Sequence, residues 1–200
     1  MSEPLQGRAS TSVKQNFTTQ KKGSTAECNN DKKPCDPGWY DDGTSYTVNW
    51  HGTDLTFTGA DLNMAARVVF AEASGTAEAV AGNYTSQLGN ERLVTAAAIF
   101  NRIGVSGYPT REKLQTLTAV VNASNQYESV FNNTRKFANS DPSSKGYSKL
   151  SDADCNDLRA AMNAVKKLMT GKGYQPSATF QLKNDGNTKG WHVIGGSKFK

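Results

Sequence analysis

With 200 residues, the chain is long enough for one domain with a hydrophobic core. Its hydrophobic fraction is 36%, and no apolar run approaches the roughly 20 residues of a membrane span, so we expect no transmembrane segment. The net charge of +5 favours contact with polyanions, but the basic residues form no nucleic-acid-binding arm, and we predict no nucleic-acid partner. Three cysteines and two histidines do not fit the spacing of a zinc site, so we predict neither a metal ion nor a cofactor.

Residues 1–37 contain few large apolar side chains and are rich in Ser, Thr, Lys, Asn and Gly. Such a stretch cannot bury enough surface to order itself. We therefore predict a flexible polar tail over 1–37 and a folded domain over 38–200. The first residues, MSEPLQGRAS, lack an apolar segment after a basic one, which predicts no Sec signal peptide. Cys28 and Cys35 are spaced to close a small loop under oxidising conditions.

The domain opens with an alternating pattern. Tyr46, Val48 and Trp50 alternate with polar residues, and Leu55 and Phe57 alternate again after HGTD. This pattern predicts a β-hairpin.

A helix follows the predicted hairpin. Thr58 and Asp61 stand three apart, as in a capping box, and apolar residues recur at helical spacing from Leu62 to Ala73. Gly75 supplies a stop signal.

Three more helices are expected, over 90–103, 110–121 and 151–173. The first is crowded with alanine, which predicts a central helix packed closely by its neighbours. Residues 76–89 are expected to form a loop or a short hairpin, and residues 124–133 a loop. Two short strands end the chain, over 177–184 and 190–199. The prediction is an α+β domain, rich in helix, with small β-hairpin elements.

Glu72 is the acid at the end of the first helix. A carboxylate there faces the negative end of the helix dipole, and its apolar neighbours Ala65 and Val69 exclude water. Both effects favour the protonated carboxyl, which is what a general acid needs near neutral pH. A glutamate near a helix end is otherwise an ordinary surface residue, so the spacing alone leaves both interpretations open.

Five stretches occur in this order along the chain: AARVVFAEASG, LVTAAAIFNRI, NQYESV, SATFQLKN and W…IGGSKF, of which AEASG and AAAIFNRI are the most specific. In these motifs and their order the chain resembles the cell-wall hydrolase family of the spore cortex-lytic enzymes, over about residues 60–200. The resemblance implies a lysozyme-like fold and an enzyme, a lytic transglycosylase or muramidase, that cleaves the β-1,4 bond between N-acetylmuramic acid and N-acetylglucosamine.

The resemblance also assigns individual residues. Glu72 falls on the catalytic acid of the family, and Gln126 and Tyr127 fall on a Gln-aromatic pair that lines the glycan cleft. Asn101 and Arg102 fall on an Asn-Arg pair, for which we expect the structural role of ending the central helix and anchoring the next loop.

Three departures from the family pattern concern the cleft. The segment VAGNYTSQLGN is an insertion, and Asn90, Glu91 and Arg92 replace a Glu-Gly-Gln element. Ser197 stands where the family has a histidine. The shape of the cleft and the residue that handles water therefore stay open.

Two reaction outcomes are compatible with one acid. A second carboxylate would give a reducing sugar, whereas attack by the muramic 6-hydroxyl gives a 1,6-anhydro sugar and needs Glu72 alone. Glu78, Glu91 and Glu128 are the candidate second carboxylates, and since none stands out the one-acid reaction is slightly favoured. Thr85 is a candidate to orient a water. The predicted substrate contacts are Gln126, Tyr127, Tyr174, Trp191 and Thr85.

The expected partner is the peptidoglycan glycan strand. A chain made in the cytoplasm without a Sec signal would reach the periplasm or cell wall either as an antibacterial effector toxin injected into a target cell or as a phage endolysin. The long polar tail favours the effector, for which we expect a secretion carrier and a periplasmic immunity protein. The non-enzymatic alternative is a peptidoglycan-binding module with a degenerate cleft.

Overall fold

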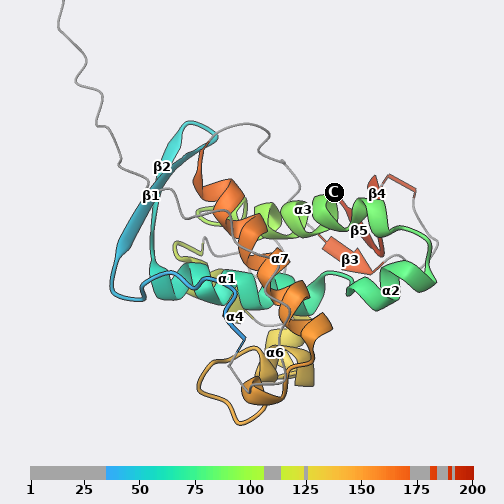
Figure 1. Ribbon diagram of the computed structural model, residues 1–200. Helices are drawn as coiled ribbons and strands as arrows, with labels where there is room; N and C mark the ends of the chain where they lie inside the picture. The colour runs from blue at the N-terminus through green and yellow to red at the C-terminus, as the bar shows by residue number, and fades with distance from the viewer. Residues whose placement is uncertain (1–34, 106–113, 124–125, 172–180, 184–188, 191) are drawn as a thin grey trace, which may run out of the picture. The chain divides into compact units, whose positions relative to one another are not determined.

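The computed structural model describes residues 35–105, 114–123, 126–171, 181–183, 189–190 and 192–200. All of them lie in the unit Lys32–Lys200. The fold is α+β, as predicted, with a hairpin ahead of a helical body and a small sheet formed by the last residues (Figure 1). Most of the predicted tail, residues 1–34, lies outside the described residues.

The elements follow one another in this order. The first part of the domain contains β1 (Ser45–Trp50), β2 (Thr53–Thr58), α1 (Gly59–Glu72), α2 (Thr76–Ala81), the 3-10 helix η1 (Thr85–Gln87) and α3 (Leu88–Phe100). The second part contains α4 (Leu117–Asn122), α5 (Glu128–Phe131), α6 (Arg135–Asn139), the 3-10 helix η2 (Tyr147–Lys149), α7 (Asp152–Met169), β3 (Gln181–Lys183), β4 (His192–Ile194) and β5 (Ser197–Phe199).

The predicted hairpin is confirmed. Strands β1 and β2 pair antiparallel around His51 and Gly52, both of which have positive φ, at 49° and 83°. Positive φ at both central residues is the geometry that two-residue hairpin turns prefer. The alternating residues Val48, Trp50 and Phe57 are buried against the helices.

The capping box of α1 is present. The Asp61 N–H donates to Thr58 Oγ1 at 3.1 Å, and the Thr58 N–H donates to Asp61 Oδ2 at 3.0 Å. The helix ends at Glu72, because Ala73 is extended, and Gly75 instead precedes α2 as its N-cap. The predicted glycine stop is thus wrong by three residues, and the acid is the last residue of its helix.

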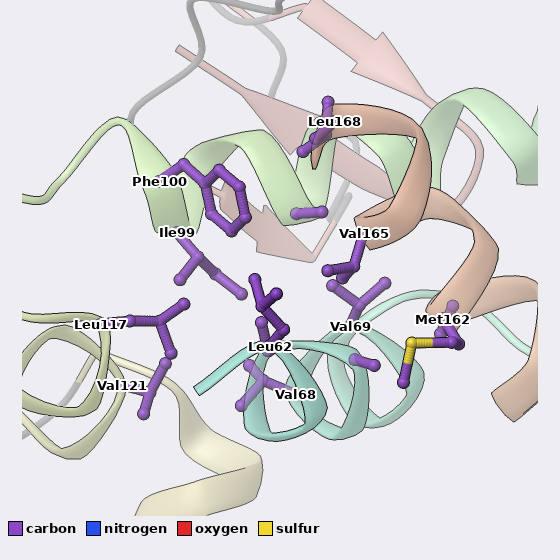
Figure 2. Packing of buried hydrophobic residues seen from close by; sticks show 14 of the residues in the cluster. Leu62, Val68, Val69, Ile99, Phe100, Leu117, Val121, Met162, Val165 and Leu168 are labelled. Atoms are coloured by element: carbon purple, nitrogen blue, oxygen red, sulfur yellow. The ribbon is translucent and has the colours of Figure 1, made fainter. Parts of the chain in front are cut away.

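Helices α1, α3 and α7 enclose the core, as Figure 2 shows. Eleven of the 13 residues of α3 are buried, which confirms the predicted central helix. Small side chains from all three helices are buried in this core: Ala65, Ala66, Ala96, Ala97 and Ala161. The side chains labelled in the core are Leu62, Val68, Val69, Ile99, Phe100, Leu117, Val121, Met162, Val165 and Leu168.

A disulfide joins Cys35 to Cys155 on α7. Cys35 therefore does not pair with Cys28, the partner that the spacing suggested. The segment after Cys35 is further fixed by the Trp39 indole, which donates to the Tyr147 hydroxyl at 3.1 Å. The disulfide and this hydrogen bond thus anchor the segment ahead of the hairpin at two points.

The C-terminal sheet differs from the prediction of two strands. It has three, in the order β3–β5–β4, because the chain reverses at Gly195 and Gly196. The predicted loop or hairpin over 76–89 and the predicted loop over 124–133 also contain short helices, α2, η1 and α5. Among the described residues, no helix is both long and apolar enough to cross a membrane.

Candidate functional site

Glu72 lies partly buried at the C-terminal end of α1. Its Oε1 accepts the backbone N–H of Ser129, in the short helix α5, at 2.8 Å. Of the hydrogen bonds that the described residues make, this is the one that reaches the Glu72 carboxylate. One carboxylate oxygen is therefore fixed by a main-chain donor from a segment 57 residues further along the chain.

The carbonyl directly after Glu72 is bound by a lysine. Lys136 Nζ, on α6, donates to the Ala73 carbonyl at 3.1 Å and lies 4.7 Å from the centre of the Phe70 ring. Burial lowers the pKa of Lys136, while Asp157 raises it to a smaller extent. The lysine thus ties the end of α1 to α6 and partly offsets the negative end of the helix dipole.

Ser74, two residues after the acid, is held by Glu91. The Ser74 hydroxyl and N–H donate to Glu91 Oε1 at 3.0 Å and 3.3 Å, and the Ser197 hydroxyl donates to the same oxygen at 2.7 Å. The Tyr84 hydroxyl in turn donates to Ser74 Oγ at 3.2 Å. Glu91 itself is 0% exposed.

A buried ion pair holds the next residues. Arg92 Nη2 lies 2.7 Å from Asp157 Oδ1, and both side chains are buried. The Thr76 N–H and hydroxyl donate to the two Asp157 oxygens at 2.9 Å and 2.5 Å. The segment that leaves Glu72 is therefore bound by side chains of α3, α6 and α7 at three successive points.

Unpartnered polar atoms gather in the segment that contacts Glu72. Of the four buried side-chain polar atoms without a hydrogen-bond partner among the described residues, three are Gln126 Nε2, Gln126 Oε1 and Ser129 Oγ. Buried polar groups are nearly always paired, so such atoms point to a ligand or an ordered water. The fourth is Glu91 Oε2.

Tyr127, which was predicted to line the glycan cleft and contact the substrate, packs in the core. It is 6% exposed and belongs to the core cluster. Burial raises the pKa of its phenol, with smaller opposing effects of Arg102, which lowers it, and Glu72, which raises it. Its ring face is covered by protein in this structure, so its contribution is to position the segment that carries Gln126 and Ser129.

Asn101 occupies the structural position expected for it. It caps the end of α3, and its Oδ1 accepts the Trp50 indole N–H at 2.7 Å. His51 Nε2 also lies 3.2 Å from this oxygen. The end of the central helix is thereby joined to the hairpin.

The other predicted site residues fall into three groups. Glu78 on α2, Glu128 on α5 and Thr85 on η1 are exposed, and Glu128 directly precedes the residue that binds Glu72. Glu91 is buried and already bound. Tyr174 and Trp191 lie outside the described residues. Within the part of the chain that the structure describes, no group of three or more His, Cys, Asp or Glu side chains is arranged to hold a metal ion.

Four residues around the acid were not predicted from the sequence. Ser129 fixes the carboxylate, and Ser74, Lys136 and Asp157 anchor the segment that follows. Two of them had a sequence signal: Ser129 lies in the NQYESV motif beside Gln126, and Ser74 lies in the AEASG motif two residues after Glu72. Lys136 and Asp157 come from distant elements with no shared pattern.

Comparisons of the chain with protein-family models, with curated proteins and with solved structures each found no match. The motifs and the geometry around Glu72 therefore carry the inference of function.

Proposed function

We propose that the protein cleaves peptidoglycan glycan strands at the β-1,4 bond between N-acetylmuramic acid and N-acetylglucosamine, with Glu72 as the general acid. One observation carries the proposal: a partly buried carboxylate, fixed at 2.8 Å by the Ser129 N–H, lies beside a segment with three unpartnered polar atoms. The motif AEASG, in which Glu72 stands, supports the same chemistry.

The acid acts on the leaving oxygen. As the glycosidic C–O bond breaks and the sugar becomes oxocarbenium-like, the Glu72 carboxyl donates its proton to the departing oxygen. The Ser129 N–H holds Oε1, which leaves Oε2 to carry the proton. The ties of Ala73, Ser74 and Thr76 keep the end of α1 in place while substrate binds.

Gln126 supplies the polar recognition group. Its amide offers one donor and one acceptor side, both unpartnered. An acetamido group offers the complementary acceptor and donor, and both sugars of the strand carry one. The Ser129 hydroxyl adds a third buried polar atom for substrate or for a water.

The one-acid reaction is favoured over hydrolysis. Glu91 is enclosed and bound by two serines, so it is not available as a second carboxylate. In the favoured reaction, the muramic 6-hydroxyl attacks C1 and gives its proton to the Glu72 carboxylate, which yields a 1,6-anhydro sugar and regenerates the acid. Exposed Glu78 and Glu128 are the candidates if the product is instead a reducing sugar.

The place of action proposed is the periplasm or cell wall of a target cell. The Cys35–Cys155 disulfide supports an oxidising compartment of this kind. It fits an injected antibacterial effector, which we favour, and a phage endolysin equally well.

The test is digestion of purified sacculi by the wild type and by Glu72→Gln, with mass spectrometry of the soluble muropeptides. The glutamine still accepts the Ser129 N–H but cannot donate the proton, so we expect a loss of at least about 100-fold in soluble product. Asp152→Asn, at an exposed acid of α7, is the matched control.

The products separate the alternatives. Anhydro-muropeptides from the wild type support lytic transglycosylation, whereas reducing-end muropeptides support a muramidase and direct attention to Glu78→Gln and Glu128→Gln. Sacculus binding without any soluble product would contradict the enzyme and leave a peptidoglycan-binding module.

A further inference from the structure

We propose that Glu91 is a positioning residue that clamps the segment after Glu72 to the C-terminal β-turn and so fixes the direction of the acid. This inference rests on the proposed function. It gives Glu91 a role that differs from that of a second carboxylate.

The clamp is centred on one oxygen atom. Glu91 Oε1 accepts from the Ser74 hydroxyl at 3.0 Å, the Ser74 N–H at 3.3 Å and the Ser197 hydroxyl at 2.7 Å. Ser74 belongs to the segment that leaves Glu72, and Ser197 is the first residue of β5. One carboxylate on α3 therefore joins two segments far apart in the chain.

The β-turn lies directly on this cluster. Gly195 has φ +60°, and a Cβ at this position would overlap Glu91 Oε2, while a Cβ at Gly196 would overlap Ser74 Oγ. The Gly195 N–H also donates to Gln87 Oε1 at 2.7 Å. The two glycines thus allow the turn between β4 and β5 to close over the carboxylate.

Glu91 has no route to substrate. It is 0% exposed, and its Oε2 faces the turn without a hydrogen-bond partner among the described residues. A buried carboxylate is costly unless its hydrogen bonds compensate. The donors to the Glu91 carboxylate come from the two segments that it joins. The burial of this carboxylate is therefore explained by its role in holding the two segments together.

The experiment compares Glu91→Gln, Ser197→Ala and Thr95→Val with the wild type on soluble, uncross-linked peptidoglycan strands of defined length. Glutamine keeps one acceptor oxygen but replaces Oε2 with a donor that faces the turn. For Glu91→Gln we expect kcat to fall about 10-fold or more while KM changes less than about threefold, because the acid is misdirected and Gln126 is untouched. Ser197→Ala removes one donor and should give a smaller loss of kcat.

Thr95→Val is the matched control. Its hydroxyl is buried on the same helix and donates to the Glu91 main-chain carbonyl at 2.8 Å, so its loss disturbs α3 but not the clamp. We expect a lower melting temperature with kcat unchanged. Hydrogen exchange of the amides of residues 73–76 and 195–199 should accelerate in Glu91→Gln but not in Thr95→Val.

The outcomes separate this inference from the proposed function. If the wild type cleaves strands and Glu91→Gln keeps its kcat, or loses no more than Thr95→Val at equal stability, the positioning role is wrong and the proposed function stands. If Glu91→Gln does not fold, an unchanged kcat in Ser197→Ala overturns the inference in the same way. If the wild type cleaves nothing, the proposed function fails and the inference falls with it.

Discussion

The carboxylate of Glu72 depends on groups that bind the main chain around it. The Ser129 N–H fixes one of its oxygens, and Lys136, Glu91 and Asp157 bind the three residues that lead away from the helix. A single acid at a helix end would otherwise sample several directions. These contacts therefore hold the end of α1 in one arrangement, which is the preorganisation that the proposed general-acid reaction requires.

The unpartnered amide of Gln126 predicts opposite effects on stability and on activity. In Gln126→Leu an apolar group of similar size replaces two buried polar atoms that have no partners. We expect the free energy of unfolding to rise by about 1–3 kcal/mol, because that desolvation cost disappears. Turnover of glycan strands should fall at the same time, because the acetamido group loses its partner.

Thermal unfolding and strand digestion measure the two effects on the same sample. Ser129→Ala removes another unpartnered oxygen while keeping the N–H that binds Glu72. It should also raise the free energy of unfolding and lower turnover, in both cases by less than Gln126→Leu does. A Gln126→Leu protein that is both less stable and fully active would contradict the role given to this amide.

At the scale of elements, the sequence predicted well wherever a local pattern decides the structure. The alternation through Val48 and Trp50 and the capping box at Thr58 and Asp61 are local signals, and the structure contains both elements. The prediction failed where distant contacts decide the structure. Helix α2 was not predicted, and its first residue, Thr76, is bound by Asp157, which lies 81 residues further along the chain.

The site shows the same division. The prediction of Glu72 rests on a local motif, whereas the hydrogen bonds from α3, α6 and α7 to the segment after it depend on the tertiary fold. The family resemblance assigned Tyr127 to the cleft, whereas the structure buries it in the core, and an aromatic side chain suits either place.

Tyr40, in the segment ahead of the hairpin, limits the stability of the protein at alkaline pH. Burial raises the pKa of Tyr40 to about 12, helped by the neighbouring Tyr46, whose ring lies 4.7 Å away. Because the folded state keeps this proton longer than the unfolded state, where the phenol titrates near 10, stability is present below about pH 10 and falls between about pH 10 and 12.

Tyr40→Phe should remove part of that decline. The ring and its packing remain, but no proton is lost, so denaturant unfolding measured from pH 9 to 12 should show a shallower fall in the free energy of unfolding than in the wild type. Equal slopes in the two proteins would mean that Tyr40 does not titrate differently in the folded state.

At the scale of the whole molecule, the Cys35–Cys155 disulfide closes the longest covalent loop of the described domain, across 120 residues. It fixes the segment before the hairpin to α7, the helix that also carries Asp157. Cross-links that close long loops stabilise mainly by restricting the unfolded chain, typically by about 2–4 kcal/mol.

We therefore expect the double variant Cys35→Ser/Cys155→Ser to lose about 2–4 kcal/mol in the free energy of unfolding. Well below its melting temperature, its turnover of glycan strands should match that of the wild type. The contacts of Glu72 with Ser129 and of Ala73 with Lys136 do not involve α7, and Asp157, which binds Thr76 from α7, is held by its ion pair with Arg92 rather than by the disulfide. Reduction of the wild type should lower its stability to the level of the double variant, and Cys28→Ser should change neither quantity. If Cys28→Ser alone reproduces the loss, Cys35 pairs with Cys28 in solution, and the anchoring of the hairpin segment to α7 depends on its hydrogen bonds instead.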